Sequence, residues 1–239
     1  CHNAMSLSGK IGLYNVIGFR FWLMLEWQIQ GGINGSIEKR KGANLPHWSC
    51  EDAVYHVSFR LFDAIPEAKR KAWFAERNFI LNNAKSMKRE LTHEEVKRLH
   101  YLYSKKIETF LDAGHGSCFL ANRKIGDIVA SALHFFDGQR YFLHAYSIMP
   151  NHTHVIVEPV SDFCLDKIVH SWKSYTANQA NKVLGREGPF WQIEPYDHII
   201  RSYKEYCYQM HYVWNNPGRM QTGFIRWKRS DFSPGKPFS

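Results

Sequence analysis

The 239-residue chain has few cysteines, and no two of them lie close together. The five cysteines are odd in number and form no C-x-x-C pair, which argues against a disulfide scaffold or a zinc ribbon. The sequence also has no Gly-rich phosphate loop, no G-x-S-x-G motif, no internal repeat and no low-complexity tract. We therefore expect a reduced, cytoplasmic protein with no nucleotide cofactor.

A long uninterrupted apolar run is missing as well. The most apolar stretch, residues 11–30, is interrupted by Arg20 and Glu26, among others. A transmembrane helix needs about 20 mostly uncharged residues, and no small-residue cleavage site follows, so we expect neither a membrane span nor a signal peptide. Residues 1–43 are interpreted as an N-terminal extension and linker of open role. Its basic run, Lys39–Lys41, suits a solvated loop and a DNA phosphate contact equally.

Acidic residues are outnumbered by basic ones. The chain has 31 Lys and Arg against 22 Asp and Glu, a formal net charge of +9. Such an excess favours a polyanionic partner, either nucleic acid or an anionic membrane surface. The aromatic content of 15% favours nucleic acid, because bases stack on aromatic faces, although most aromatic side chains will lie in the core.

Apolar periodicity predicts alternating strands and helices. The expected strands cover residues 54–61, 141–148, 152–157 and 190–193, and the expected helices begin near residues 66, 96, 125, 165 and 203. A βαββαβ order predicts an α+β fold, a ferredoxin-like antiparallel sheet with helices packed on one face, plus extra helices. We expect one catalytic domain over residues 44–220 and a flexible tail over residues 221–239.

Two histidines follow the turn Pro150-Asn151 that joins the second and third strands. His152 and His154 are two residues apart on a strand, so their side chains point to the same face. Two imidazoles side by side form half of a metal site. The alternative is a pair of strand histidines that face water or bond to neighbours, which is the more common meaning of an isolated His-x-His.

The helix expected over residues 165–184 has an apolar stripe that can pack on the sheet. Tyr175 and Gln179 are four residues apart on one edge of that stripe. We expect both to lie beside the sheet surface that holds His152 and His154. Gln179 could then supply a third metal ligand through its carbonyl oxygen, and Tyr175 could reach a group bound to the metal.

These residues resemble the REP-associated tyrosine transposases, which belong to the single-tyrosine branch of the HUH endonucleases. The resemblance covers residues 44–220, and it depends on the order and spacing of several short motifs more than on any one of them. The motifs are Leu45-Pro46-His47-Trp48, Tyr55-His56-Val57-Ser58-Phe59-Arg60, Pro150-Asn151-His152-Thr153-His154, Trp172-Lys173-Ser174-Tyr175-Thr176 with Gln179, Gly188-Pro189-Phe190-Trp191-Gln192, Tyr196-Asp197-His198-Ile199-Ile200-Arg201 and Asn216-Pro217.

The resemblance implies a DNA transposase and endonuclease that cleaves and rejoins single-stranded, hairpin-forming DNA. It implies Mg²⁺ or Mn²⁺ at His152, His154 and Gln179, although nitrogen ligands also suit Zn²⁺. Tyr175 would be the nucleophile, leaving a 5′-phosphotyrosine and a free 3′-OH. The protein would act in the bacterial cytoplasm near the nucleoid, as a monomer or homodimer.

Three basic residues and three further tyrosines are candidates for contact with DNA. Lys173, Lys182 and Arg201 are candidate DNA contacts, although an ordinary surface lysine is the more common meaning of Lys182. Other tyrosines, namely Tyr196, Tyr203 and Tyr206, are expected in the core or stacked on DNA.

Two positions depart from the family pattern. Thr153 replaces a strongly hydrophobic residue between the histidines, and Pro195 should disturb strand pairing.

Two other functions stay open: a non-catalytic regulator derived from a transposase, and an RNA-binding domain with a fortuitous histidine pair.

Overall fold

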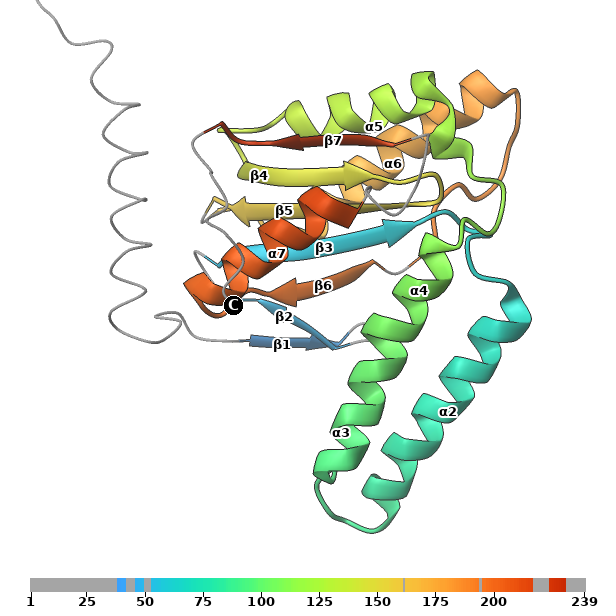
Figure 1. Ribbon diagram of the computed structural model, residues 1–239, viewed down its shortest axis with the longest axis vertical. Coiled ribbons are helices and arrows are strands. Elements are labelled where there is room, and N and C mark those ends of the chain that lie inside the picture. The colour runs from blue at the N-terminus through green and yellow to red at the C-terminus, as the bar shows by residue number, and fades with distance from the viewer. Residues whose placement is uncertain are drawn as a thin grey trace, which may run out of the picture.

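The computed structural model describes residues 38–41, 46–49, 53–160, 162–193, 195–216 and 224–230. Its centre is a five-stranded sheet in which every neighbouring pair is antiparallel. Across the sheet the strands are β6 (Tyr196–Ile199), β3 (Tyr55–Arg60), β5 (His152–Pro159), β4 (Tyr141–Ile148) and β7 (Ile225–Lys228). The expected α+β class is therefore confirmed (Figure 1).

The hairpin predicted around the two histidines is present. Strands β4 and β5 pair in register from Ile148 and Thr153 outward, and the backbone N–H of Met149 donates to the carbonyl of His152 over 2.8 Å. Pro150 and Asn151 occupy the tight turn, where such residues are favoured. The histidines consequently start a rigid central strand instead of lying in a loop.

Strand β5 divides its side chains between two faces. Thr153, Val155 and Val157 alternate with His152, His154 and Ile156. Val155 and Val157 belong to the larger core cluster, together with the buried faces of two helices. These helices are α5 (Arg123–His134) and α6 (Leu165–Leu184). The apolar stripe of α6 thus packs against the apolar face of the sheet.

The opposite face of the sheet is covered in part by α7 (Tyr203–Asn215). Met210 and Val213 of this helix pack on Ala145 and Ile156 in a second buried cluster. Figure 1 shows α7 in front of the strands and α6 behind them. The expectation that the helices pack on one face is therefore wrong, because α7 has its own apolar stripe and covers the other face.

A helical arm projects from one end of the sheet (Figure 1). It consists of α2 (Glu67–Ser86), α3 (His93–His100), the π-helix η1 (Tyr101–Lys106) and α4 (Ile107–Asp112), and the short 3₁₀ helix η2 (Phe119–Ala121) follows it. Thr92 and Glu95 form the predicted capping box at the start of α3. The single amphipathic helix expected beyond Val96 is instead divided by the π-helix.

The last expected strand is displaced. Residues 190–193 form only an isolated bridge, Leu61 to Trp191, because the ammonium of Lys173 binds the carbonyls of Gln192 and Ile193 over 2.7 and 2.6 Å. The sheet is completed by β6 instead, just after Pro195.

The two ends of the chain also differ from expectation. Within the tail expected to be flexible, β7 (Ile225–Lys228) pairs with β4. The basic run Lys39–Lys41 belongs to β1 (Glu38–Lys41), which pairs with β2 (Pro46–Ser49), so that part of the expected linker is a hairpin. The rest of the N-terminal extension, residues 1–37, lies outside the described residues. No helix in the part of the chain described is long and apolar enough to cross a membrane.

Candidate active site

The two histidines of the hairpin lie side by side on the sheet face that α7 covers. Their ring centroids are 4.9 Å apart, and both side chains are buried, with 0% and 1% of their surface exposed. The Nε2 atom of each ring is buried and has no hydrogen-bond partner. Buried polar atoms are nearly always bonded, so two adjacent exceptions point to a group that binds there.

The tautomer of His152 follows from its neighbour Asn151. The amide nitrogen of Asn151 donates to the carbonyls of Leu111 and His115, over 3.1 and 2.9 Å, so its oxygen faces Nδ1 of His152 at 2.7 Å. An amide oxygen can only accept, so Nδ1 of His152 carries the proton. The lone pair of the neutral ring is then on Nε2, as a metal ligand requires.

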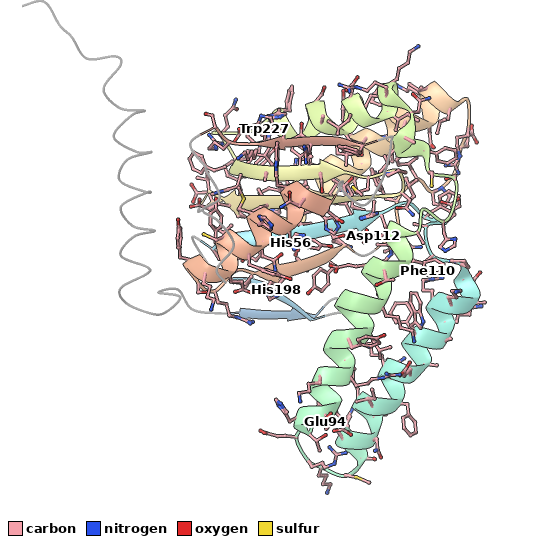
Figure 2. All side chains as sticks on the ribbon, viewed as in Figure 1. His56, Glu94, Phe110, Asp112, His198 and Trp227 are labelled. Atoms are coloured by element: carbon pink, nitrogen blue, oxygen red, sulfur yellow. The ribbon has the colours of Figure 1, made fainter. Side chains whose placement is uncertain are left out.

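His154 is held by a third histidine on the neighbouring strand. Nδ1 of His154 and Nε2 of His56 are 3.0 Å apart, and His56 also bonds to Gln209 of α7. When Nδ1 of His154 donates, its Nε2 presents a lone pair beside that of His152. This arrangement matches the outer hydrogen bond that orients most metal-binding histidines. Figure 2 shows His56 beneath α7.

Burial keeps these rings neutral. It lowers the pKa of His56 to about 4 and that of His152 to about 3, with further lowering by His198 and Arg60 respectively. The pKa of His154 is also lowered well below its ordinary value, first by burial and then by the two neighbouring histidines. Neutral imidazoles are the form that binds a metal ion.

We expect the folded protein to lose stability as the pH falls below about 6.5. The unfolded chain protonates His56 and His152 near that pH, whereas the folded chain does so only near pH 4 and pH 3. Between these values the unfolded state holds more protons, so the free energy of unfolding falls by about 1.4 kcal/mol per pH unit for each such histidine. Denaturant midpoints at about pH 7.5 and about pH 5 measure this decline. A His56→Gln variant should decline less steeply, and equal slopes would contradict the assignment.

The side chains around the two imidazoles provide several of the donor atoms that a divalent metal needs. Among the described residues, no three His, Cys, Asp or Glu side chains are arranged to hold a metal ion. Two neutral imidazole nitrogens are nevertheless in place, and the carboxylate of Asp112 lies 3.9 Å from Nε2 of His152. Two acceptors facing each other make a negative potential that suits a cation. A metal bound by the two imidazoles would need a third protein ligand, which a neutral side-chain oxygen can supply.

The C-terminal end of α7 provides both a tyrosine and such an oxygen. The ring of Tyr212 lies 5.4 Å from that of His154 and 5.8 Å from that of His56. Asn216, four residues later, is 4% exposed, and its amide nitrogen donates to the Tyr212 hydroxyl over 3.5 Å. The Oδ1 atom of Asn216 is buried without a hydrogen-bond partner. Tyr212 and Asn216 thus have the spacing expected of Tyr175 and Gln179, and they lie on the histidine face.

The structure does not bring Tyr175 and Gln179 to the histidines. Both are on α6, which packs on the face opposite the imidazoles, and the side chain of Tyr175 is 53% exposed. The expected placement is wrong because an apolar helix stripe buries itself against the apolar side of β5. Sequence reasoning overlooks Tyr212, although Asn216-Pro217 was already among the matching motifs.

The other expected site residues are also spread around the molecule. Lys173 binds loop carbonyls on the α6 side, and Lys182 is exposed near the end of α6. Arg201 lies just before α7, where its backbone N–H donates to Glu205 over 2.7 Å. Of the alternative tyrosines, Tyr206 is buried, and its hydroxyl lies 2.6 Å from Nδ1 of His144. DNA binding by Lys173, Lys182 and Arg201 remains a prediction.

The similarity of the chain to known proteins is distant. No protein-family model and no curated protein matches the chain. Among solved structures, the chain is similar to a REP-associated tyrosine transposase bound to a REP hairpin. The two are 13% identical, the match covers 76% of this chain and 73% of that one, and the TM-score is 0.42.

Proposed function

We propose that the protein cleaves and rejoins single-stranded DNA through a covalent link to Tyr212. The observation that carries the proposal is the position of Tyr212 beside His154, one of two adjacent imidazoles whose Nε2 atoms are buried without partners. A phenol beside a cation site is suited to nucleophilic attack on a phosphodiester. The order β6-β3-β5-β4 would then be the ferredoxin-like core named in the sequence resemblance.

Three side chains would hold a divalent metal, Mg²⁺ or Mn²⁺, in this proposal. They are His152 and His154 through Nε2 and Asn216 through Oδ1, and Asn216 takes the role expected of Gln179. When bound, the metal supplies positive charge that offsets the negative charge on the phosphate oxygens. Asn151 and His56 orient the two imidazoles, and Asn216 also orients the Tyr212 hydroxyl.

The reaction follows from the position of the phenol. Tyr212 loses its proton as its oxygen bonds to phosphorus, and the bond from phosphorus to the 3′ oxygen breaks. The departing 3′ oxygen gains a proton, which leaves a 3′-OH and a 5′-phosphotyrosine. Attack by another 3′-OH reverses these steps and joins two strands, because the ester conserves the energy of the broken bond.

The substrate proposed is single-stranded or hairpin DNA. The net charge of +9 supports a polyanion, and the motif resemblance supports DNA of this form. A duplex-reading protein would place a recognition helix in the major groove, whereas α7 packs on the sheet beside the histidines.

Removal of divalent metal should abolish the reaction. We expect an end-labelled single-stranded oligonucleotide to be cleaved in Mg²⁺ or Mn²⁺ and to stay intact in EDTA, because charge neutralisation at the phosphate is lost. Gel electrophoresis after protease treatment measures both products. Binding without cleavage in either metal would favour the alternative, a regulator that binds DNA without cutting it.

A further inference from the structure

A row of polar side chains continues across the sheet from His154 to the open edge strand. Antiparallel register places Ser147 of β4 opposite His154 and Arg226 of β7 opposite Ser147. Side chains that are directly opposite share one face of a sheet. Neighbouring strands are about 4.8 Å apart, so the backbone of Arg226 lies about 10 Å from that of His154.

The middle of the row is polar but has no hydrogen-bond partner. Ser147 is fully buried, and its hydroxyl has no hydrogen-bond partner among the residues that the structure describes. Such a hydroxyl is uncommon inside a folded protein and indicates a polar ligand or water nearby. The row from His154 to Arg226 therefore suits a polar occupant along its whole length.

At the edge strand β7, two cationic side chains lie over the indole ring of Trp214. The guanidinium carbon of Arg226 lies 4.3 Å from the ring centroid of Trp214, and the ammonium of Lys228 lies 5.1 Å from it. One arm of Arg226 also donates to the Trp214 carbonyl over 2.9 Å, which leaves its other N–H groups for a ligand. The side chain of Arg226 is exposed.

A guanidinium and an ammonium on one ring concentrate positive charge at this edge, and this charge attracts an anion. The cross-strand register from Arg226 through Ser147 to His154 places the backbone beneath these cations about 10 Å from that of His154, so they border the candidate active site. Phosphodiesters have the charge and the acceptor oxygens that a guanidinium and an ammonium bind.

We propose that Arg226 and Lys228, held by Trp214, bind a backbone phosphate of a nucleic-acid strand. This inference rests on the proposed function of the neighbouring histidine face. The bound phosphate and the phosphate that Tyr212 attacks lie near each other on the same strand, since the backbones of Arg226 and His154 are about 10 Å apart. The subsite guides the strand along β7 without reading its sequence.

The test is the salt dependence of binding to a fluorescent single-stranded oligonucleotide, measured by anisotropy in EDTA so that no strand is cut. Each lost phosphate contact should lower the slope of log affinity against log salt by about 0.7. The double variant Arg226→Gln, Lys228→Gln loses this one phosphate contact, so it should lose about 0.7 of the wild-type slope and about tenfold in affinity at low salt. A wild-type slope in the double variant, or no binding by the wild type, would overturn the subsite.

Matched controls separate this inference from the proposed function. Lys167→Gln removes an exposed lysine on α6, on the opposite face, and should leave the slope unchanged. Tyr212→Phe should keep the wild-type slope while losing cleavage. If the wild type binds with the expected slope but never cleaves, the proposed function fails and the phosphate subsite stands. If Lys167→Gln lowers the salt slope as much as the double variant does, the loss is a general effect of charge, and this would contradict the subsite.

Discussion

Replacing Tyr212 with Phe is expected to abolish DNA cleavage and the covalent protein–DNA adduct. The substitution keeps the ring beside His154 and removes only the hydroxyl that would attack phosphorus. Loss of a nucleophile costs on the order of 10⁴-fold or more in rate. A cleavage assay on labelled oligonucleotide, followed by denaturing gel electrophoresis of the adduct, measures the loss.

The matched control for this variant is Tyr175→Phe. Tyr175 also precedes an amide residue by four positions, but it is exposed on the far side of the sheet. We expect Tyr175→Phe to retain wild-type cleavage and adduct formation. If the Tyr175 variant forms no adduct while the Tyr212 variant stays active, Tyr175 is the nucleophile and the assignment to Tyr212 is wrong.

Replacing His152 or His154 with Ala should remove metal binding and cleavage while single-stranded DNA binding persists. Each substitution deletes a neutral nitrogen that the fold holds ready through Asn151 or His56. Changes to the outer hydrogen bonds of a metal ligand already cost about 10- to 100-fold, so loss of the ligand itself should cost more. Titration calorimetry with Mn²⁺ gives a readout that does not depend on cleavage.

His170→Ala is the control for a general effect of losing a histidine, because His170 is exposed on α6. Melting temperatures should show that each variant still folds, and His154→Asn offers a polar replacement if the Ala variant unfolds. Mn²⁺ affinity equal to wild type in both active-site variants would contradict the proposed metal ligands.

Much of the fold follows from local patterns in the sequence. The hairpin at Pro150-Asn151, the capping box at Thr92 and the span of α6 appear as expected, because turn chemistry, capping and a strong apolar stripe are local signals. The sequence analysis does not predict β7, because its apolar–basic alternation, Ile-Arg-Trp-Lys, covers only four residues and is too short to distinguish a strand from a loop. Its pairing with β4 is a long-range property.

The site was predicted in part, and its error has a physical origin. His152 and His154 share a face, as the alternation of a strand requires. The same alternation puts Thr153, Val155 and Val157 on the other face, and an apolar helix stripe packs on an apolar face. Applied to α6, this rule separates Tyr175 from the histidines and leaves the histidine face to α7, whose C-cap is Asn216. The partner roles of His56 and Asn151 depend on side-chain geometry, which spacing alone does not indicate.

The most direct test of the account is to identify the tyrosine that carries the DNA. A suicide oligonucleotide traps the covalent intermediate, and mass spectrometry of the digested adduct locates the phosphotyrosine. The structure-based account predicts a nucleotide on Tyr212 alone, with its phosphate on the phenolic oxygen. A nucleotide on Tyr175, or on any tyrosine away from the face of His152 and His154, would contradict it.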